Sequence, residues 1–189
     1  ASFPEVQVKL HVAAGLDADA LAREAVERLG GRHVFGVDTG PLAQVVGELL
    51  RARGQRLAVA ESCTAGRIAA EITSVPGASN YFLGGGVVYS NNEKSRQCGV
   101  SPALVAEHGA VSEAVARSLA EGMGAATGAD WAIAVTGLAG PGGGSAEKPV
   151  GTVHLACAGA GLTTHQGRSR PRRPLRLMTG VKGRPGATR

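Results

Sequence analysis

Hydrophobic and polar residues follow two different periods near the start of the chain. Apolar residues at every second position from Val6 to Val12 predict a half-buried strand. A helix is predicted next, because Asp17 can cap its start and Gly30 can stop it. Its apolar face is formed by Leu21, Ala25 and Leu29. One strand and one helix cannot bury a core, so residues 1–36 are interpreted as a partial α+β segment.

From residue 37 onward the pattern changes to strands that alternate with helices. A helix is predicted from Pro41 to Gly54, with an apolar face formed by Leu42, Val45, Val46, Leu49 and Leu50. Short apolar stretches predict strands at 57–60, 84–90, 131–135 and 151–158. Helical spacing of apolar residues predicts further helices through Ile68 and Ile72 and from Val111 to Met123. This alternation predicts an α/β fold, a three-layer α/β/α sandwich, for residues 37–164.

The composition excludes several classes of protein. Hydrophobic residues make up 43% of the 189 positions, as in globular proteins, and aromatic residues only 3%, which argues against a base-stacking surface. No apolar run approaches the roughly 18 residues of a membrane span, and Ala1–Val12 lacks the apolar stretch of a signal peptide. A cytoplasmic protein is therefore expected, with Cys63, Cys98 and Cys157 as reduced thiols.

The positive charge of the chain is confined to its end. The net charge is +5, yet residues 165–189 hold eight Lys and Arg and no acidic residue, whereas residues 1–164 hold 12 basic and 15 acidic residues. The terminal stretch also contains three prolines and no apolar period, so it is interpreted as a disordered tail. A nucleic-acid-binding role ranks lowest among the hypotheses, because the main body carries no excess of basic residues.

The first candidate for chemistry is the turn after the strand at 57–60. Groups at the carboxyl end of such a strand face the usual ligand crevice of α/β folds, and amides at the next helix start can hold an oxyanion. Ser62 stands where a nucleophile would be. The simpler reading is that Ser62 or Thr64 only caps the helix, and local geometry alone favours this reading.

A second candidate is the polar segment that follows the strand at 84–90. Lys94 can serve as the base for a serine if burial lowers its pKa, and Tyr89 can hydrogen-bond either group. Taken alone this signal is weak, because exposed lysines at helix starts are far commoner than catalytic ones.

The third candidate is the glycine-rich segment 136–145. Its five glycines in ten residues would let backbone amides approach an anion, although it lacks the Lys-Ser/Thr ending of a P-loop. A plain flexible loop is the alternative. The five histidines lack the spacing of a zinc site, so neither a metal nor another cofactor is expected.

Taken together, five blocks in order resemble the nicotinamide-nucleotide amidase family, whose domain also forms the C-terminal part of CinA-type proteins. The blocks are ESCTAG at 61–66, PGASNYFLGGGVVYSNNEK at 76–94, GVSPALVAEHGAVSEAVA at 99–116, TGLAGPGGG at 136–144 and EKPVGTV at 147–153. The resemblance covers about residues 41–164. Residues 4–36 resemble the end of the middle segment of longer CinA-type proteins, which suggests a chain cut from such a protein.

The resemblance implies deamidation of nicotinamide mononucleotide to nicotinic acid mononucleotide and ammonia without a metal. It implies that Ser62 is the nucleophile, that Lys94 is its base and that Tyr89 belongs to the same catalytic motif. It assigns the oxyanion to backbone amides near Cys63 and Thr64. The substrate-binding residues that it implies are Asn91 and, around the ribose-phosphate, Thr136, Gly137, Ala139 and Gly140. It also allows for a homo-oligomer, because relatives often associate, and it implies no membrane partner.

The chain departs from the family pattern in two places that bear on function. Ala65 replaces the first glycine of the usual ESCTGG, and the Pro- and Arg-rich tail replaces a closing amphipathic helix. Loss of that helix would leave apolar sheet surface uncovered, and Arg170 is the nearest substitute for an arginine that binds substrate in relatives. Two further hypotheses therefore stay open: a cysteine hydrolase that uses Cys63, and a nucleotide- or protein-binding module without catalysis.

Overall fold

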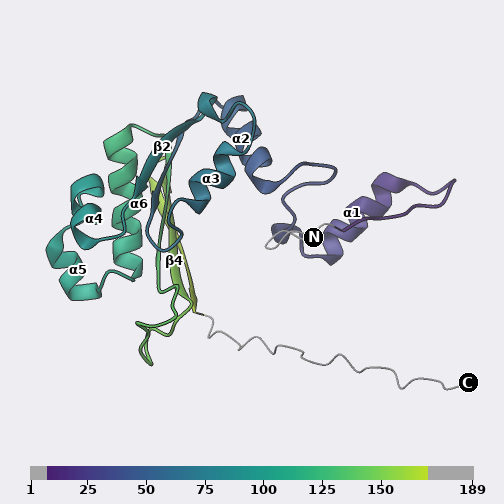
Figure 1. Cartoon of the computed structure of the whole chain (residues 1–189). Coiled ribbons are helices and arrows are strands. Elements are labelled where there is room, and N and C mark those ends of the chain that lie inside the picture. The colour runs from purple at the N-terminus through teal and green to yellow at the C-terminus, as the bar shows by residue number, and fades with distance from the viewer. Residues whose placement is uncertain (1–7, 170–189) are drawn as a thin grey trace, which may run out of the picture.

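The computed structural model describes residues 8–169, and within them one mixed sheet forms the centre of the molecule (Figure 1). Its strands are β1 (Leu57–Glu61), β2 (Phe82–Val87), β3 (Trp131–Gly137), β4 (Thr152–Gly159) and β5 (Leu162–Ser169). They lie in the order β2-β1-β3-β4-β5. β1 runs parallel to both of its neighbours, whereas β3, β4 and β5 pair antiparallel.

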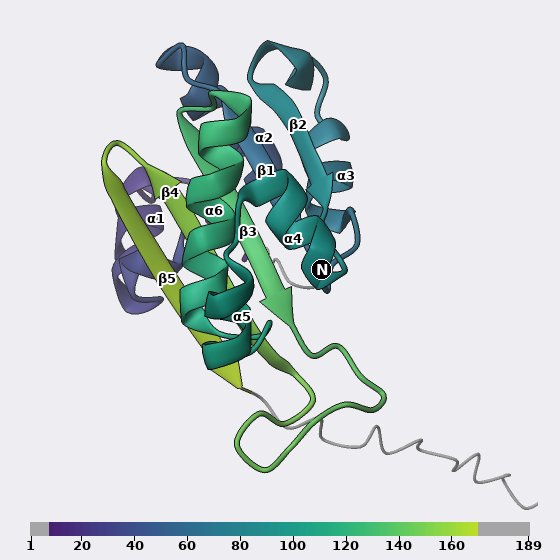
Figure 2. The ribbon, with the colours of Figure 1, turned by 90° about the vertical axis from the view of Figure 1, so that its left-hand side faces the viewer.

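Helices cover both faces of this sheet, which confirms the predicted three-layer α/β/α arrangement (Figures 1 and 2). One face carries α2 (Leu42–Ala52) and α3 (Arg67–Thr73). The other carries α4 (Asn91–Cys98), α5 (Pro102–His108) and α6 (Glu113–Thr127). The remaining elements are α1 (Ala18–Arg28), which lies off the sheet, and two short 3-10 helices at Gly31–His33 and Ala78–Asn80.

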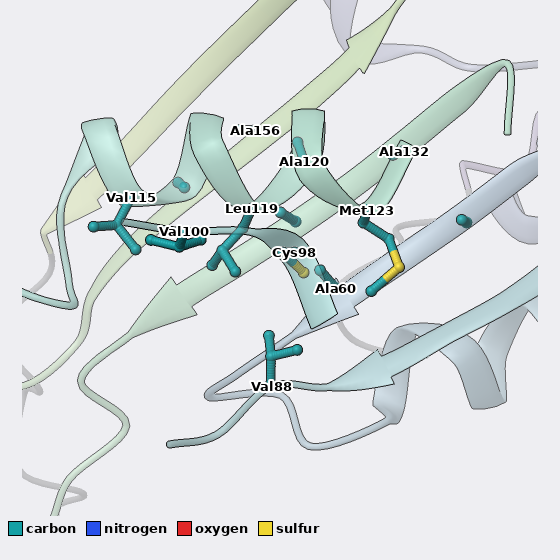
Figure 3. Packing of buried hydrophobic residues seen from close by; sticks show 13 residues of the cluster. Ala60, Val88, Cys98, Val100, Val115, Leu119, Ala120, Met123, Ala132 and Ala156 are labelled. Atoms are coloured by element: carbon teal, nitrogen blue, oxygen red, sulfur yellow. The ribbon is translucent and has the colours of Figure 1, made fainter. Parts of the chain in front are cut away.

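The main core lies between α6 and the sheet and is built largely from small residues (Figure 3). The sheet contributes Ala58, Ala60, Ala132, Ala134 and Ala156, and α6 contributes Val115, Ala116, Leu119, Ala120 and Met123. A second cluster packs α2 and α3 against β1 through Leu50, Leu57, Val59, Ile72, Ala78 and Tyr81. Alanine on the sheet lets α6 approach closely, which is how so few aromatic residues suffice for a core.

Gly122 and Gly124 of α6 provide a matched test of this close packing. A Cβ at Gly122 would overlap the main-chain oxygen of Cys98 at the end of α4, whereas one at Gly124 would meet only the Cβ of Ala132, at 3.5 Å. We expect Gly122→Ala to lower the free energy of unfolding by about 1–3 kcal/mol through overpacking. Gly124→Ala should raise it by up to about 1 kcal/mol through helix propensity. Urea unfolding of both variants measures the difference, and equal effects would contradict this packing.

The predicted helix in the N-terminal segment is confirmed, but the predicted strand before it is not. Asp17 caps α1 by accepting a hydrogen bond from the amide of Ala20 at 2.9 Å, and Gly30 follows the helix with a φ of 72°. The described part of the predicted strand, residues 8–12, has no strand conformation. Alternation predicts a strand only where another strand can pair with it, and in residues 8–169 no strand lies beside this segment.

Two further differences concern the edges of the sheet. The predicted strand at 84–90 is β2, which begins at Phe82, ends at Val87 and is half-buried because it forms an edge. β5 was not predicted, and it extends five residues into the segment interpreted as a tail. Its residues carry no apolar alternation, but Ala160 and Gly161, with φ of 50° and 74°, form the tight turn of a hairpin with β4. Arg170 and the rest of the tail lie outside the described residues.

The face of β4 that points away from α6 is only partly covered. Ala156 belongs to the α6 core, so Val153, Leu155 and Cys157 point the other way, and each is half-buried. In residues 8–169 no helix has the length and apolarity needed to cross a membrane.

Candidate active site

The candidate site lies at the carboxyl ends of three parallel strands. The chain leaves β1 for α3 on one face and reaches β3 from α6 on the opposite face, so the crossovers diverge beside β1. Such a switch point leaves a crevice in α/β sheets. Here a cavity of about 250 Å³ lies there. It is lined by Ser62, Cys63, Tyr89, Asn91, Lys94, Ala110, Val111, Thr136, Gly137, Leu138, Ala139, Gly140 and Gly142.

Ser62 and Lys94 meet in this cavity, 32 positions apart in the sequence. The Nζ atom of Lys94 lies 3.2 Å from Oγ of Ser62. Both residues are buried, with 7% of Ser62 and 2% of Lys94 exposed. The amide of Ser62 donates to the Val135 carbonyl at 3.0 Å, which fixes the end of β1 against β3. Lys94 lies in the first turn of α4, whose start is capped by Ser90.

The surroundings of Lys94 favour its neutral form. Burial lowers the pKa of the Lys94 ammonium, partly opposed by the neighbouring Cys63 and Cys98 thiols. Nζ also lies 2.9 Å from each of the main-chain oxygens of Val88 and Tyr89. A neutral amine has two N–H donors and one lone pair. The two carbonyls can take both donors, so the lone pair is left for the hydroxyl proton of Ser62.

Other residues predicted for the site take different positions. Tyr89 lines the cavity with a side chain that is 73% exposed, and its hydrogen bond to Lys94 is made by the main-chain carbonyl rather than by the hydroxyl. Asn91 and the predicted loop residues also line the cavity, whereas Thr64 does not. Two lining residues, Ala110 and Val111, lie outside the three segments singled out from the sequence, whereas Leu138 and Gly142 belong to the glycine-rich segment 136–145.

The thiol of Cys63 also faces the cavity. Burial raises the pKa of the Cys63 thiol, and the negative charge of Glu61 adds to this, whereas Lys94 opposes it. The thiolate, not the thiol, is the nucleophilic form of cysteine. The local charges therefore favour Ser62 over Cys63 as the nucleophile.

The glycine-rich segment lines the cavity and is anchored where it leaves β3. The hydroxyl of Thr136 donates to the Ala110 carbonyl at 2.8 Å, and the amide of Leu138 donates to the Thr152 carbonyl at 2.8 Å. A Cβ at Gly137 would come within 2.8 Å of that same Thr152 oxygen and 3.0 Å of Sγ of Cys63. Only glycine fits this close approach, so the segment is a fixed wall of the cavity where it leaves β3.

Glu61 is the functional residue that sequence reasoning missed. Its side chain is 1% exposed and accepts hydrogen bonds from the amides of Gly66, Ile68 and Ala69 at 3.0, 3.1 and 2.8 Å. Burial raises the pKa of the Glu61 carboxyl, but the Thr64 side chain and these amides bring it below its ordinary value. The amides at the start of α3 are thus occupied, which corrects the expectation that they are free for an oxyanion.

A larger cavity, of about 710 Å³, lies between α1 and the segments on either side of it. It brings together none of the predicted site residues, so the smaller cavity is the candidate active site. In the described part of the chain, no three His, Cys, Asp or Glu side chains are arranged to hold a metal ion.

Comparison with known proteins places this site in a family. Residues 39–173 match the CinA C-terminal domain. The chain belongs to this family. It is 52% identical over 161 residues to a CinA-like protein of Geobacter sp. (strain M21), and 45% identical over 159 residues to one of Synechocystis sp. (strain ATCC 27184 / PCC 6803 / Kazusa). These alignments cover 84% and 80% of this chain but only 39% and 38% of the relatives, so it spans about two fifths of their length.

Solved structures of the CinA family share the fold. The competence/damage inducible protein CihA from Agrobacterium tumefaciens has a TM-score of 0.66 and 39% identity, over 69% of this chain and 83% of that one. A CinA superfamily protein from Escherichia coli has a TM-score of 0.65 and 32% identity, over 67% of this chain and 74% of that one. These relatives are described as CinA-type proteins, and their names specify no reaction.

Proposed function

We propose that this chain is an amidase that converts nicotinamide mononucleotide to nicotinic acid mononucleotide and ammonia through a Ser62–Lys94 dyad. The observation that carries the proposal is the 3.2 Å approach of a buried lysine, with a lowered pKa, to a serine at the edge of a cavity. A serine needs such a base to become a nucleophile, and a lysine serves as one only when it is neutral.

The first half of the reaction would form an ester with the enzyme. Oγ of Ser62 attacks the carboxamide carbon while its proton moves to Nζ of Lys94. The amide of Cys63, a residue that lines the cavity, supports the oxyanion that forms, because it donates to no other main-chain group in the described chain. Collapse of the intermediate breaks the C–N bond, and Lys94 returns its proton to the departing nitrogen, which leaves as ammonia.

The second half would release the acid. A water molecule takes the place of ammonia and loses a proton to neutral Lys94 as it attacks the ester carbon. The bond to Oγ then breaks, and Ser62 recovers its proton from Lys94. The products are nicotinic acid mononucleotide and the free enzyme, with no redox step.

The cavity favours a mononucleotide as the substrate. Its volume of about 250 Å³ lies just below the range of about 300–1,000 Å³ that is usual for ligand pockets, so it suits a small ligand. The loop from Gly137 to Gly142 lines the cavity together with Lys94, and its amides at Ala139, Gly140 and Gly142 would be offered to a phosphate. Binding the remote phosphate would orient the carboxamide for attack.

The direct test is ammonia release by the purified chain from nicotinamide mononucleotide, with the acid product followed by chromatography. Nicotinamide riboside, which lacks the phosphate, is the matched control and should be turned over less efficiently. If the mononucleotide raises the melting temperature but no ammonia appears, the chain is a binding module and the proposal is wrong.

The pH dependence of kcat/KM should report Lys94. Only the neutral amine is active, so kcat/KM should rise tenfold per pH unit below the pKa of Lys94 and level off above it. Since burial lowers this pKa, the plateau should begin below the ordinary lysine value of about 10.4. A rate that falls across this range as the pH rises would contradict the role of Lys94 as a base.

A further inference from the structure

Glu61 lies directly before Ser62, and the proposed chemistry assigns it no step. We infer that Glu61 is a positioning residue: its carboxylate ties the turn that carries Ser62 to the first amides of α3. This inference rests on the proposed function. It predicts that Glu61 acts on turnover through the geometry of Ser62 and not through contact with substrate.

The hydrogen bonds of Glu61 close a loop around the nucleophile. Oε2 accepts from the amides of Gly66 and Ile68, and Oε1 accepts from the amide of Ala69. The turn from Ser62 to Ala65 therefore lies between Glu61 and the three amides that donate to the Glu61 carboxylate. The main-chain oxygen of Glu61 also accepts from the amide of Val88, at 2.8 Å. One residue thus links the serine turn to the segment whose carbonyls hold Lys94.

The backbone of this turn needs such support. Ala65 has a φ of 50° and Gly66 a φ of 95°, so two successive residues lie in the left-handed region. A residue with a side chain, such as Ala65, adopts this conformation only when its surroundings enforce it. The three amide bonds to Glu61 begin at the next residue, which makes them the enforcing contacts.

The charge of Glu61 has a second effect on the site. Its bonds occupy the first amides of α3, so the donor left for an oxyanion beside the cavity is the amide of Cys63. Its negative charge also raises the pKa of the Cys63 thiol. The same carboxylate therefore orients Ser62 and adds to the effect of burial, which is the main reason why the pKa of the neighbouring thiol is raised.

The test compares Glu61→Gln and Glu61→Ala with Asp130→Asn. Asp130 is also a carboxylate that accepts a backbone amide, that of Arg56 at 2.7 Å, but at the opposite end of β1. Displacement of the Ser62 hydroxyl lowers the rate of the chemical step and leaves substrate binding intact. We therefore expect kcat to fall about 10-fold in Glu61→Gln and about 100-fold in Glu61→Ala. KM should change less than threefold. Asp130→Asn should keep kcat within twofold even where it lowers the melting temperature.

Amide hydrogen exchange of residues 62–69 provides a readout that does not depend on turnover. Exchange at Gly66, Ile68 and Ala69 should accelerate at least tenfold in Glu61→Gln, and Asp130→Asn should leave it unchanged. Unchanged exchange, or a kcat within twofold of the parent chain in Glu61→Gln, would overturn the inference. If the parent chain releases no ammonia, the proposed function fails, while the exchange result still decides whether Glu61 holds the turn.

Discussion

Ser62→Ala is expected to lower kcat by about 10⁴-fold or more while the fold is retained, as for other serine nucleophiles. The variant keeps Lys94 and the glycine-rich wall but has no oxygen to attack the carboxamide. Because only one atom is lost from a residue that is 7% exposed, the melting temperature should change little. The measurement is ammonia release under single-turnover conditions, with circular dichroism to verify folding.

Cys63→Ala is the matched control for Ser62→Ala, since both residues line the same cavity. We expect Cys63→Ala to keep kcat within about tenfold, because burial keeps this thiol protonated. The serine-hydrolase and cysteine-hydrolase hypotheses predict opposite results for these two variants. Activity that survives Ser62→Ala and disappears in Cys63→Ala would show a cysteine hydrolase.

Lys94→Arg is expected to lower kcat by about 10²–10⁴-fold, the usual contribution of a general base. Arginine can still donate to the carbonyls of Val88 and Tyr89, but it stays protonated in proteins and so has no lone pair to accept the Ser62 proton. The rising limb of the pH profile should therefore disappear together with the rate. Stopped assays from about pH 6 to about pH 11, a range that extends past the ordinary lysine pKa of about 10.4, measure both effects.

Arg96→Met tests whether such a loss is specific. Arg96 lies on the next turn of α4, 69% exposed and 2.7 Å from Glu93. Solvent screens an exposed ion pair of this kind, so removing the charge should change stability little and leave kcat unchanged. If Lys94→Arg and Arg96→Met had equal activities, Lys94 would not be the base.

The fold was largely predictable because apolar spacing reports which residues are buried. The face of α2 and the core face of α6 follow directly from leucine and valine at helical intervals. β5 was missed because Thr163, Thr164 and Gln166 carry no alternation, and the strand depends on pairing with β4. The strand predicted at 6–12 failed for the opposite reason, since its alternation finds no partner strand in the described chain.

The site was predictable only in part. Ser62 and Lys94 could be proposed singly, but no local pattern states that two segments 32 positions apart will meet. The role of Glu61 was hidden because a carboxylate before a polar turn reads as an exposed residue, and burial becomes visible only with its three amide donors in place. Glu61 would have been found from its position: it is a charged residue between an apolar strand and a turn that contains two residues of left-handed conformation, Ala65 and Gly66.

Ser62 and Lys94 are each held by the end of a different neighbouring strand, so the proposed catalysis depends on an edge of the sheet. Ser62 follows β1, whereas the carbonyls that hold Lys94 follow β2, an edge strand with three consecutive glycines. Glycine weakens a strand, and sheet edges open before sheet centres. A brief separation of β2 from β1 would pull the amine away from the hydroxyl while the rest of the molecule stays folded. On heating, enzymatic activity would then be lost through local opening of β2 at a lower temperature than that at which the whole protein unfolds.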